Sequence, residues 1–485
     1  MVNTKEYFKL SLIYTLVAAF PNVLQLIVQP AIKGMGAASF GHMGVSEAII
    51  TLLFTICIFS MESGISRFYY DVRENKDRFN KLVSSIFTGI LIRGAIILGA
   101  ILILSPYIGQ LFKQDALRDF GTYGVALVIS AINRAIVTTA VSLFRNEKRI
   151  NSFIIVNVSS GLFRAGFQLI GVFFFSMSFL GYVWGTAVGS TVVSIAVLIY
   201  TYRRCGFHYD KSMNGELLHF GWPLLEYSLI GWGLQYIDRF FLEKGDPQKL
   251  GIYTNALQFA IGLQLIIQGL VNATQPEIFR YMSEGIHKRQ EEIKKLSNMF
   301  MIQSMIFIVG AIIPAIIFIS LTFSKSELRF STSIIAIVFV RYVLRSQYNV
   351  FALPIMFMKR TRIFSTVNIM ALVVSVLLNW IFIPRIGFYG AIIAFIGANI
   401  TQVLAVYYFQ QKIIPISWNL KKVMIFPLLI LLVSILCELA QVFLSLPVMA
   451  GAIIITVVTF AGIFFLYKRE LMEIVNKRLK LIRNV

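Results

Sequence analysis

The sequence predicts an all-α integral membrane protein with about fourteen transmembrane helices. We expect two parallel six-helix lobes related by a pseudo-twofold axis along the membrane normal, an appended helix pair, and both termini on the cytoplasmic side. Three observations predict this fold. Apolar runs of membrane-spanning length fill the chain, Lys and Arg gather in alternate loops, and scarce polar residues recur at a nearly constant offset.

The composition is that of a chain whose main solvent is lipid. Of its 485 residues 57% are hydrophobic and only 14% are charged, and the mean hydropathy is +0.77. A soluble domain carries about a quarter charged residues. Since one crossing needs about 20 apolar residues, the expected helices leave no room for a sizeable extramembrane domain. We therefore expect the chain to act inside the bilayer.

Short polar connections delimit the apolar runs that we interpret as membrane helices. These runs cover residues 10–32, 43–66, 82–104, 120–143, 152–175, 181–202, 218–243, 250–275, 297–323, 331–356, 364–383, 388–409, 424–444 and 449–467.

The basic residues set the expected orientation. With a cytoplasmic N-terminus, most of the 44 Lys and Arg fall in cytoplasmic loops, as the positive-inside rule requires. The clusters RNEKR (145–149) and KRTR (359–362) and the tail (468–483) act as topological anchors in this interpretation. We therefore assign the net charge of +21 to topology and to contact with anionic membrane lipid, and not to nucleic acid.

A duplication is visible in the polar residues. A shift of 211 residues places Arg134 on Arg345, and the same shift places Asn157 on Asn368. A shift of 213 residues relates helices 1–2 to helices 7–8 in the same way. Six helices per copy is an even number, so both copies have the same orientation. Parallel repeats of this kind are one design of membrane transporters, with the substrate route between the halves.

The duplication divides the chain into three expected parts. Residues 1–206 form an N-lobe of helices 1–6, and residues 207–411 form a C-lobe of helices 7–12. Residues 412–485 hold helices 13–14 and a basic cytoplasmic tail.

Polar residues spaced three or four apart share one face of several helices. On helix 2 this face carries Glu47, Thr51 and Thr55. Such faces indicate a hydrated cavity between the lobes, although single amides can equally serve as interhelical hydrogen bonds. The residues that we expect to line the cavity are Asn22, Gln25, Glu62, Asn157, Gln168, Gln264, Gln268 and Asn368.

Charges within the apolar runs are mostly positive. A charge near mid-bilayer is costly unless it faces protein or water, so these residues are functional candidates. The surplus of cations favours an anionic ligand, and the arginine fork suits phosphate. Glu226 and Asp238 are candidates for charge balance or ion coupling, and Arg239 could instead pair with its neighbour Asp238. The candidate substrate-binding residues are Arg93, Arg134, Arg164, Arg239, Arg341 and Arg345.

The sequence offers no sign of enzyme chemistry. The four histidines and three cysteines lack metal-ligand spacing, and the chain has no phosphate-binding Walker loop. We expect a transporter that is not an enzyme, with no catalytic residues, metal or cofactor.

Several stretches resemble a known family. They are GISRFYYD (64–71), FRNEKRINSF (144–153), LGYVWGTAVG (180–189), YIDRFFL (236–242), LGIYTNA (250–256) and RIGFYGAIIA (385–394). Through about residues 8–410 the chain resembles the polysaccharide transporters, or lipid-linked oligosaccharide (O-antigen type) flippases, of the multidrug/oligosaccharidyl-lipid/polysaccharide (MOP) exporter superfamily.

The resemblance implies a flippase of the bacterial cytoplasmic membrane. Such proteins move an undecaprenyl-diphosphate-linked oligosaccharide from the cytoplasmic to the outer leaflet by alternating access, for export of surface polysaccharide. A cationic lumen in that family is thought to contact the diphosphate. The resemblance also implies a monomer that passes its product to a polysaccharide polymerase and chain-length machinery.

Two alternatives remain. A cation-coupled multidrug exporter of the same superfamily commonly uses an acidic residue on helix 1, where this sequence has Asn22, Gln25 and Gln29. A polysaccharide polymerase or ligase would be expected to carry a large external loop, and none of the expected loops is large.

Overall fold

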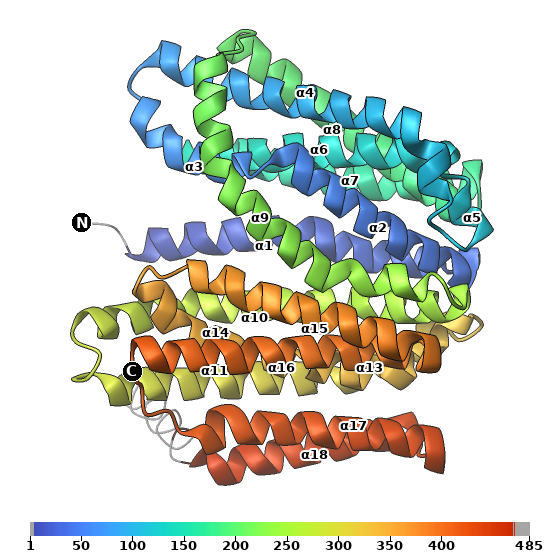
Figure 1. Ribbon diagram of the computed structural model, residues 1–485, viewed down its shortest axis with the longest axis vertical. Helices are drawn as coiled ribbons and strands as arrows, with labels where there is room; N and C mark the ends of the chain where they lie inside the picture. Colours follow the sequence, from blue (N-terminus) through green and yellow to red (C-terminus); the bar gives the residue numbers. More distant parts are fainter. Residues whose placement is uncertain (1–3, 469, 471–485) are drawn as a thin grey trace. The chain divides into compact units, whose positions relative to one another are not determined.

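The computed structural model describes residues 4–468 and residue 470, and all regular secondary structure in this part of the chain is helical (Figure 1). The predicted basic tail from residue 471 lies outside the described residues. Helix contacts divide the chain into two compact units, Met1–Gly251 and Ile252–Val485. The division between them falls inside α10 (Pro247–Ser283).

The first unit, coloured blue to green in Figure 1, is built around α6, which packs against α2, α4 and α8. Its helices are α1 (Thr4–Ala31), η1 (Lys33–Met35), α2 (Gly36–Ile58), α3 (Met61–Val72), α4 (Lys76–Gly109), α5 (Asp115–Arg118), α6 (Phe120–Asn146), α7 (Ile150–Ile170), η2 (Gly171–Phe175), α8 (Phe179–Cys205) and α9 (Lys211–Leu242). The repeat boundary expected after residue 206 stays a prediction; α9, which follows it, packs against α2, α3 and α4.

The second unit pairs α15 with α16 and docks the final helices against α11, α13 and α14. Its helices after α10 are α11 (Gln290–Gly310), α12 (Ile312–Thr322), η3 (Glu327–Phe330), α13 (Ser331–Val340), α14 (Tyr342–Phe357), α15 (Arg362–Ile386), α16 (Phe388–Ile413), η4 (Lys421–Ile425), α17 (Phe426–Leu444) and α18 (Val448–Leu466).

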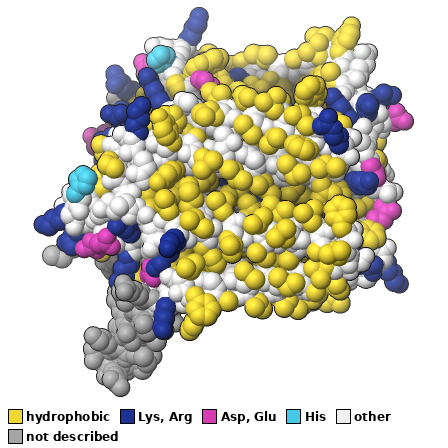
Figure 2. All heavy atoms as spheres, turned by 60° about the horizontal axis from the view of Figure 1, so that its bottom comes forward, with side chains coloured by type: hydrophobic (Ala, Val, Ile, Leu, Met, Phe, Trp, Pro, Cys, Tyr) yellow, Lys and Arg dark blue, Asp and Glu magenta, His cyan; other side chains and the backbone are white. Residues whose placement is uncertain are grey.

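Within the described residues, eleven helical stretches are long and apolar enough to cross a membrane, so this is a multi-pass membrane protein. In this part of the chain every predicted run coincides with one helix or two consecutive helices. The runs 10–32, 218–243 and 331–356 are not among the eleven stretches. The count of fourteen crossings and the orientation of the termini therefore stay predictions. Figure 2 shows apolar side chains over most of the visible face, with Lys and Arg toward its margins.

Two turns repeat the same backbone geometry at the offset of 211 residues. Lys148 follows α6 and Lys359 follows α14, and both have a left-handed backbone with φ 58°. The amide of Arg149 donates to the carbonyl of Phe144, and the amide of Arg360 donates to the equivalent carbonyl of Ile355. A left-handed lysine is uncommon, so its recurrence at matching positions supports the duplication.

Glycines bring α8 into backbone contact with α7. Gly181, Gly185 and Gly189 lie four residues apart and therefore share one face of α8. A Cβ atom added at Gly185 would overlap the main-chain oxygen of Phe167, and one at Gly189 would overlap that of Phe163. Small residues at this spacing let membrane helices pack closely, where van der Waals contact replaces the hydrophobic effect.

Gly185→Ala should therefore destabilise the first unit, by about 1–3 kcal/mol for overpacking. We expect a lower melting temperature and a lower yield of monodisperse protein in detergent. Gly166→Ala is the matched control, because a Cβ at Gly166 on α7 meets no atom within 4 Å. A Gly185→Ala protein as stable as the Gly166→Ala protein would contradict the close-packing argument.

Within the second unit, a buried ion pair joins the end of the described chain to η4, and a hydrogen bond joins it to α11. Glu470 is 7% exposed, and its carboxylate accepts hydrogen bonds from Lys422 at 2.6 Å and from Asn298 on α11 at 3.0 Å. Burial by itself raises the pKa of Glu470, but the hydrogen bonds that its carboxylate accepts, led by that from Lys422, outweigh burial and hold this pKa below its ordinary value. A carboxyl whose pKa falls on folding stabilises the native state above its unfolded pKa.

Glu470→Gln should lower the melting temperature at neutral pH. The difference from wild type should shrink as the pH falls below about 4.3, where the carboxyl of the unfolded chain takes up its proton. Thermal unfolding in detergent over a pH series measures this difference. A difference that stays constant down to acid pH would show that the charge of Glu470 contributes nothing.

Candidate functional site

The first unit holds a cluster of two arginines and one carboxylate on three helices. Glu47 on α2 places Oε1 2.9 Å from Nη1 of Arg134 on α6. Its Oε2 lies 3.6 Å from Nη2 of Arg164 on α7. The three side chains are 24–39% exposed, so each is partly accessible. The cluster carries two positive charges and one negative charge.

Each arginine also has contacts that do not involve Glu47. The Arg134 guanidinium lies over the ring of Phe54, 4.8 Å from its centroid, and Nη1 donates to Oγ1 of Thr51 at 3.4 Å. The backbone of Arg164 is fixed by α8, because a Cβ added at Gly189 would lie only 3.0 Å from the Cα of Arg164. The close approach of α7 and α8 thus positions the second arginine.

An amide network lies one helical turn from Arg164. Gln168 is fully buried; its Nε2 donates to Thr186 at 2.9 Å, and its Oε1 accepts from Gln25 at 3.1 Å. Gln25 in turn accepts from the hydroxyl of Tyr182 at 3.0 Å. These bonds join α1, α7 and α8, and they are the interhelical hydrogen bonds that the sequence left open as the alternative for Gln25 and Gln168.

Arg93 stabilises a break between α2 and α3. Phe59 and Ser60 both have left-handed backbones there, with φ 49° and 57°. Nε of Arg93 on α4 donates to the carbonyl of Cys57 at 2.8 Å, and the guanidinium lies 5.6 Å from the ring centroid of Phe59. A cation is favourable at a helix C-terminus because the last carbonyls carry partial negative charge. Arg93 therefore has a structural partner.

Two further arginines are deeply buried, one in each unit. Arg239 on α9 is 8% exposed and Arg341, between α13 and α14, is 3% exposed. In each, Nε and Nη1 have no hydrogen-bond partner within the described part of the chain. Each guanidinium lies against an aromatic ring: Arg239 is 4.4 Å from the centroid of Tyr236, and Arg341 is 3.7 Å from that of Phe395.

The remaining predicted residues divide by exposure. Asn157, Asn368 and Asp238 are buried; Asn368 accepts from Gln402 at 2.8 Å, and Asp238 accepts from the amide of Arg239. Glu62 is half-buried, and its Oε2 has no partner among the described residues. The exposed ones are Asn22, Glu226, Gln264, Gln268 and Arg345.

Glu47 is the residue that the sequence analysis did not count among the charged candidates. It lies on the predicted polar face of helix 2, but the spacing of residues along one helix does not predict which residues of α6 and α7 it contacts. The i to i+4 relation of Glu47 and Thr51 was the available signal, since both contact Arg134.

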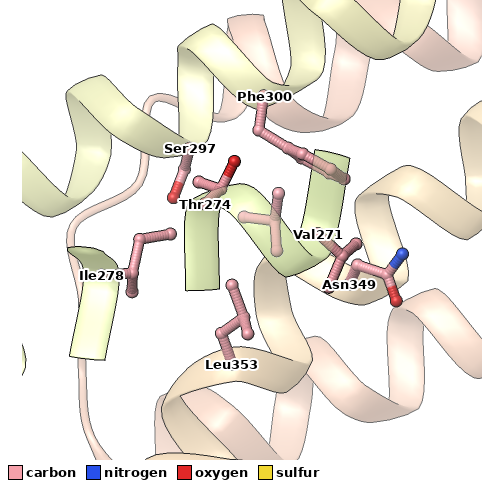
Figure 3. A pocket seen from close by; sticks show the side chains of 8 residues that line it. Val271, Thr274, Ile278, Ser297, Phe300, Asn349 and Leu353 are labelled. Carbon is pink, nitrogen blue, oxygen red and sulfur yellow. The ribbon is translucent and has the colours of Figure 1, made fainter. Parts of the chain in front are cut away.

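A small pocket in the second unit lies between α10, α11 and α14 (Figure 3). Thr274, Ser297 and Asn349 are its polar residues, and the other lining side chains are apolar. Its volume of about 10 Å³ admits at most about one water molecule. The pocket is therefore too small for a sugar or a diphosphate.

Eleven helical stretches long and apolar enough to cross a membrane define the described part of the chain as a multi-pass membrane protein. The family of polysaccharide biosynthesis proteins matches residues 35–284. The chain belongs to this family. No curated protein sequence matches the chain.

Solved structures share the fold at low sequence identity. The lipid II flippase MurJ in an inward closed conformation is 14% identical with a TM-score of 0.69, covering 95% of this chain and 100% of that one. An inward-facing multidrug resistance MATE family transporter of the MOP superfamily is 17% identical with a TM-score of 0.65, covering 81% and 94%. A MOP superfamily transporter from Pyrococcus furiosus is 15% identical with a TM-score of 0.52, covering 83% and 95%. The chain thus shares its fold with these three proteins.

Arg93→Ala should lower stability, because it removes the donor to the Cys57 carbonyl. A hydrogen bond from a charged group contributes about 1.5–3 kcal/mol, which detergent melting curves can resolve. Arg345→Ala is the control, since Arg345 is exposed and its guanidinium lies over the ring of Tyr348, 5.0 Å from the centroid. Equal melting temperatures for the two variants would remove the structural role assigned to Arg93.

Proposed function

We propose that the chain is a flippase that moves an undecaprenyl-diphosphate-linked oligosaccharide from the cytoplasmic to the outer leaflet of a bacterial cytoplasmic membrane by alternating access. Membership of the polysaccharide biosynthesis family supports a role in surface polysaccharide export. The fold shared with a lipid II flippase supports translocation as the mode of action. In this proposal the protein works as a monomer and passes its product to a polymerase and chain-length machinery.

The surplus of arginine inside the helices carries the proposal. Arg134 and Arg164 share the single carboxylate of Glu47. Arg239 and Arg341 are buried with nitrogens that lack a hydrogen-bond partner in the described residues. Such charges cost several kcal/mol in a membrane unless an opposite charge, an aromatic ring or water compensates them. An anionic ligand would supply what the chain itself does not.

A diphosphate fits this requirement better than a simple anion. Its two phosphates can each take a guanidinium, and the arginine fork binds two oxygens of one phosphate at once. Arg134 and Arg164 both reach the carboxylate of Glu47, at 2.9 Å and 3.6 Å, so both are within reach of one small anionic group. We therefore propose Arg134 and Arg164 as the first diphosphate contacts, with Arg239, Arg341 and Arg345 as further anion-binding residues.

A multidrug exporter is the second candidate, because a MATE family transporter shares the fold. The charge argues against it. The apolar part of α1, Leu16–Ala31, carries no carboxylate, and the clustered charges of the first unit are in positive excess. A positive lumen repels cationic drugs. Efflux of a cationic dye by cells that express the chain would favour this second candidate.

Arg134→Ala and Arg164→Ala should each lower polysaccharide export at least tenfold, since each removes a charge-assisted contact of about 1.5–3 kcal/mol. Arg345→Ala should lower export to a similar extent. The measurement is surface polysaccharide in cells whose own flippase is deleted and replaced by each variant, with the membrane content of the protein checked by immunoblot. Lysine at each position should restore part of the activity if charge alone matters.

Arg67→Ala is the control for this series. Arg67 is more than half exposed, and its Nη1 lies 2.8 Å from Oδ2 of Asp71 on the same helix. We expect normal export from this variant. Full export by all three alanine variants at Arg134, Arg164 and Arg345 would refute the cationic site.

A further inference from the structure

Glu47 neutralises only part of the charge that faces it. Its two oxygens reach arginines on different helices, Arg134 at 2.9 Å and Arg164 at 3.6 Å. Among the described residues no second carboxylate pairs with either arginine. The cluster therefore keeps one uncompensated positive charge while Glu47 stays in place.

The charge of a lipid-linked diphosphate matches that of the two arginines without Glu47. A diphosphate esterified at both ends keeps one negative charge on each phosphate, so the two arginines alone would neutralise it. With Glu47 still between them, the occupied site would hold one negative charge in excess. At membrane depth, where the effective dielectric is low, that excess is strongly unfavourable. Substrate and Glu47 thus compete for the same two guanidinium groups.

Glu47 could instead be a permanent clamp that holds the arginines in position. The geometry favours competition. Arg134 rests on Phe54 and Thr51 without Glu47, and the backbone of Arg164 is fixed by its close contact with Gly189. The 3.6 Å separation from Arg164 is an ion pair beyond hydrogen-bond length. Glu47 is also 24% exposed, so its carboxylate can leave toward water.

We propose that Glu47 is an internal counter-anion: it occupies Arg134 and Arg164 when no substrate is bound, is displaced by the diphosphate, and returns when the substrate leaves. The inference rests on the proposed function and adds its regulation. Because Glu47 and the diphosphate compete for the same two arginines, Glu47 lowers the affinity for the substrate and speeds its release. Loss of Glu47 should therefore tighten binding and slow turnover.

The test uses the full-length protein in lipid nanodiscs and farnesyl-diphosphate-linked N-acetylglucosamine, a short-chain diphosphate diester, as the probe. Glu47→Gln keeps the side-chain shape and removes the competing charge. Because this variant has no charge that competes with the diphosphate, we expect it to bind the probe about tenfold more tightly than wild type. This change in affinity corresponds to about 1.4 kcal/mol of binding free energy. In vesicles, flipping of the probe should be slower than in wild type. A clamp would give the opposite binding result, because misplaced arginines bind more weakly.

Glu147→Gln is the matched control. Glu147 also bridges two arginines, Arg204 at 2.7 Å and Arg149 at 3.5 Å, but it follows the last residue of α6. This variant should leave probe affinity unchanged. Glu47→Asp keeps a carboxylate if one is needed for folding, and its shorter reach should strengthen binding severalfold. Unchanged or weaker affinity in folded Glu47→Gln, or in Glu47→Asp, would overturn the inference.

The outcomes also separate this inference from the proposed function. If wild type binds no probe and Arg134→Ala and Arg164→Ala change nothing, the proposed function fails. If wild type binds the probe and the arginine variants abolish binding, but Glu47→Gln binds no more tightly, only the counter-anion role fails.

Discussion

A charge inside a membrane helix needs compensation that water would otherwise supply, and this constraint governs the arrangement of the arginines. The described arginines satisfy it in three ways. Arg134 and Arg164 face the carboxylate of Glu47, Arg93 binds a carbonyl freed by a helix break, and Arg239 lies on an aromatic ring. None of the three arrangements neutralises the arginines completely, because Nη2 of Arg93 and Nε and Nη1 of Arg239 also lack a hydrogen-bond partner among the described residues. The first differs in that two arginines on different helices share one carboxylate, and the positive charge that remains suits this cluster to an anionic ligand.

The backbone contact of α7 with α8 is the second requirement of that cluster. Gly185 and Gly189 face the turns of α7 that carry Gln168 and Arg164. Side chains at these glycines would push α7 away from α8, and the amide network of Gln168 with Thr186 would separate. Small residues on one helix thus determine where polar residues lie on the next. The position of Arg164 in the charged cluster thus depends on van der Waals contact between α7 and uncharged glycines of α8.

The sequence predicted the helices well because their signal is local. Apolar length fixes a spanning segment, and the offset of 211 residues is repeated in the backbone of Lys148 and Lys359. It did not predict the break at Phe59 and Ser60, where neither Gly nor Pro marks the left-handed residues. It placed Glu47 on a polar face, but pairing across α2, α6 and α7 depends on the angles between helices. The sequence also did not predict which arginines are exposed. The spacing of Arg341 and Arg345 predicts that they share one helical face, but Arg341 is buried and Arg345 is exposed.

The two copies expected from the duplication differ at the position of Glu47. Arg134 in α6 and Arg345 in α14 occupy equivalent positions, but the residue equivalent to Glu47 at the offset of 213 is Ala260. Arg134 accordingly pairs with Glu47, whereas Arg345 is exposed and lies 5.0 Å from the ring centroid of Tyr348. An aromatic ring stabilises a cation without neutralising it. The expected first copy thus has a carboxylate beside its arginine, which in our proposal an incoming anion displaces, and the expected second copy has an aromatic ring in that place. A transporter built from two such copies would bind an anion by exchange in one half and by simple attraction in the other.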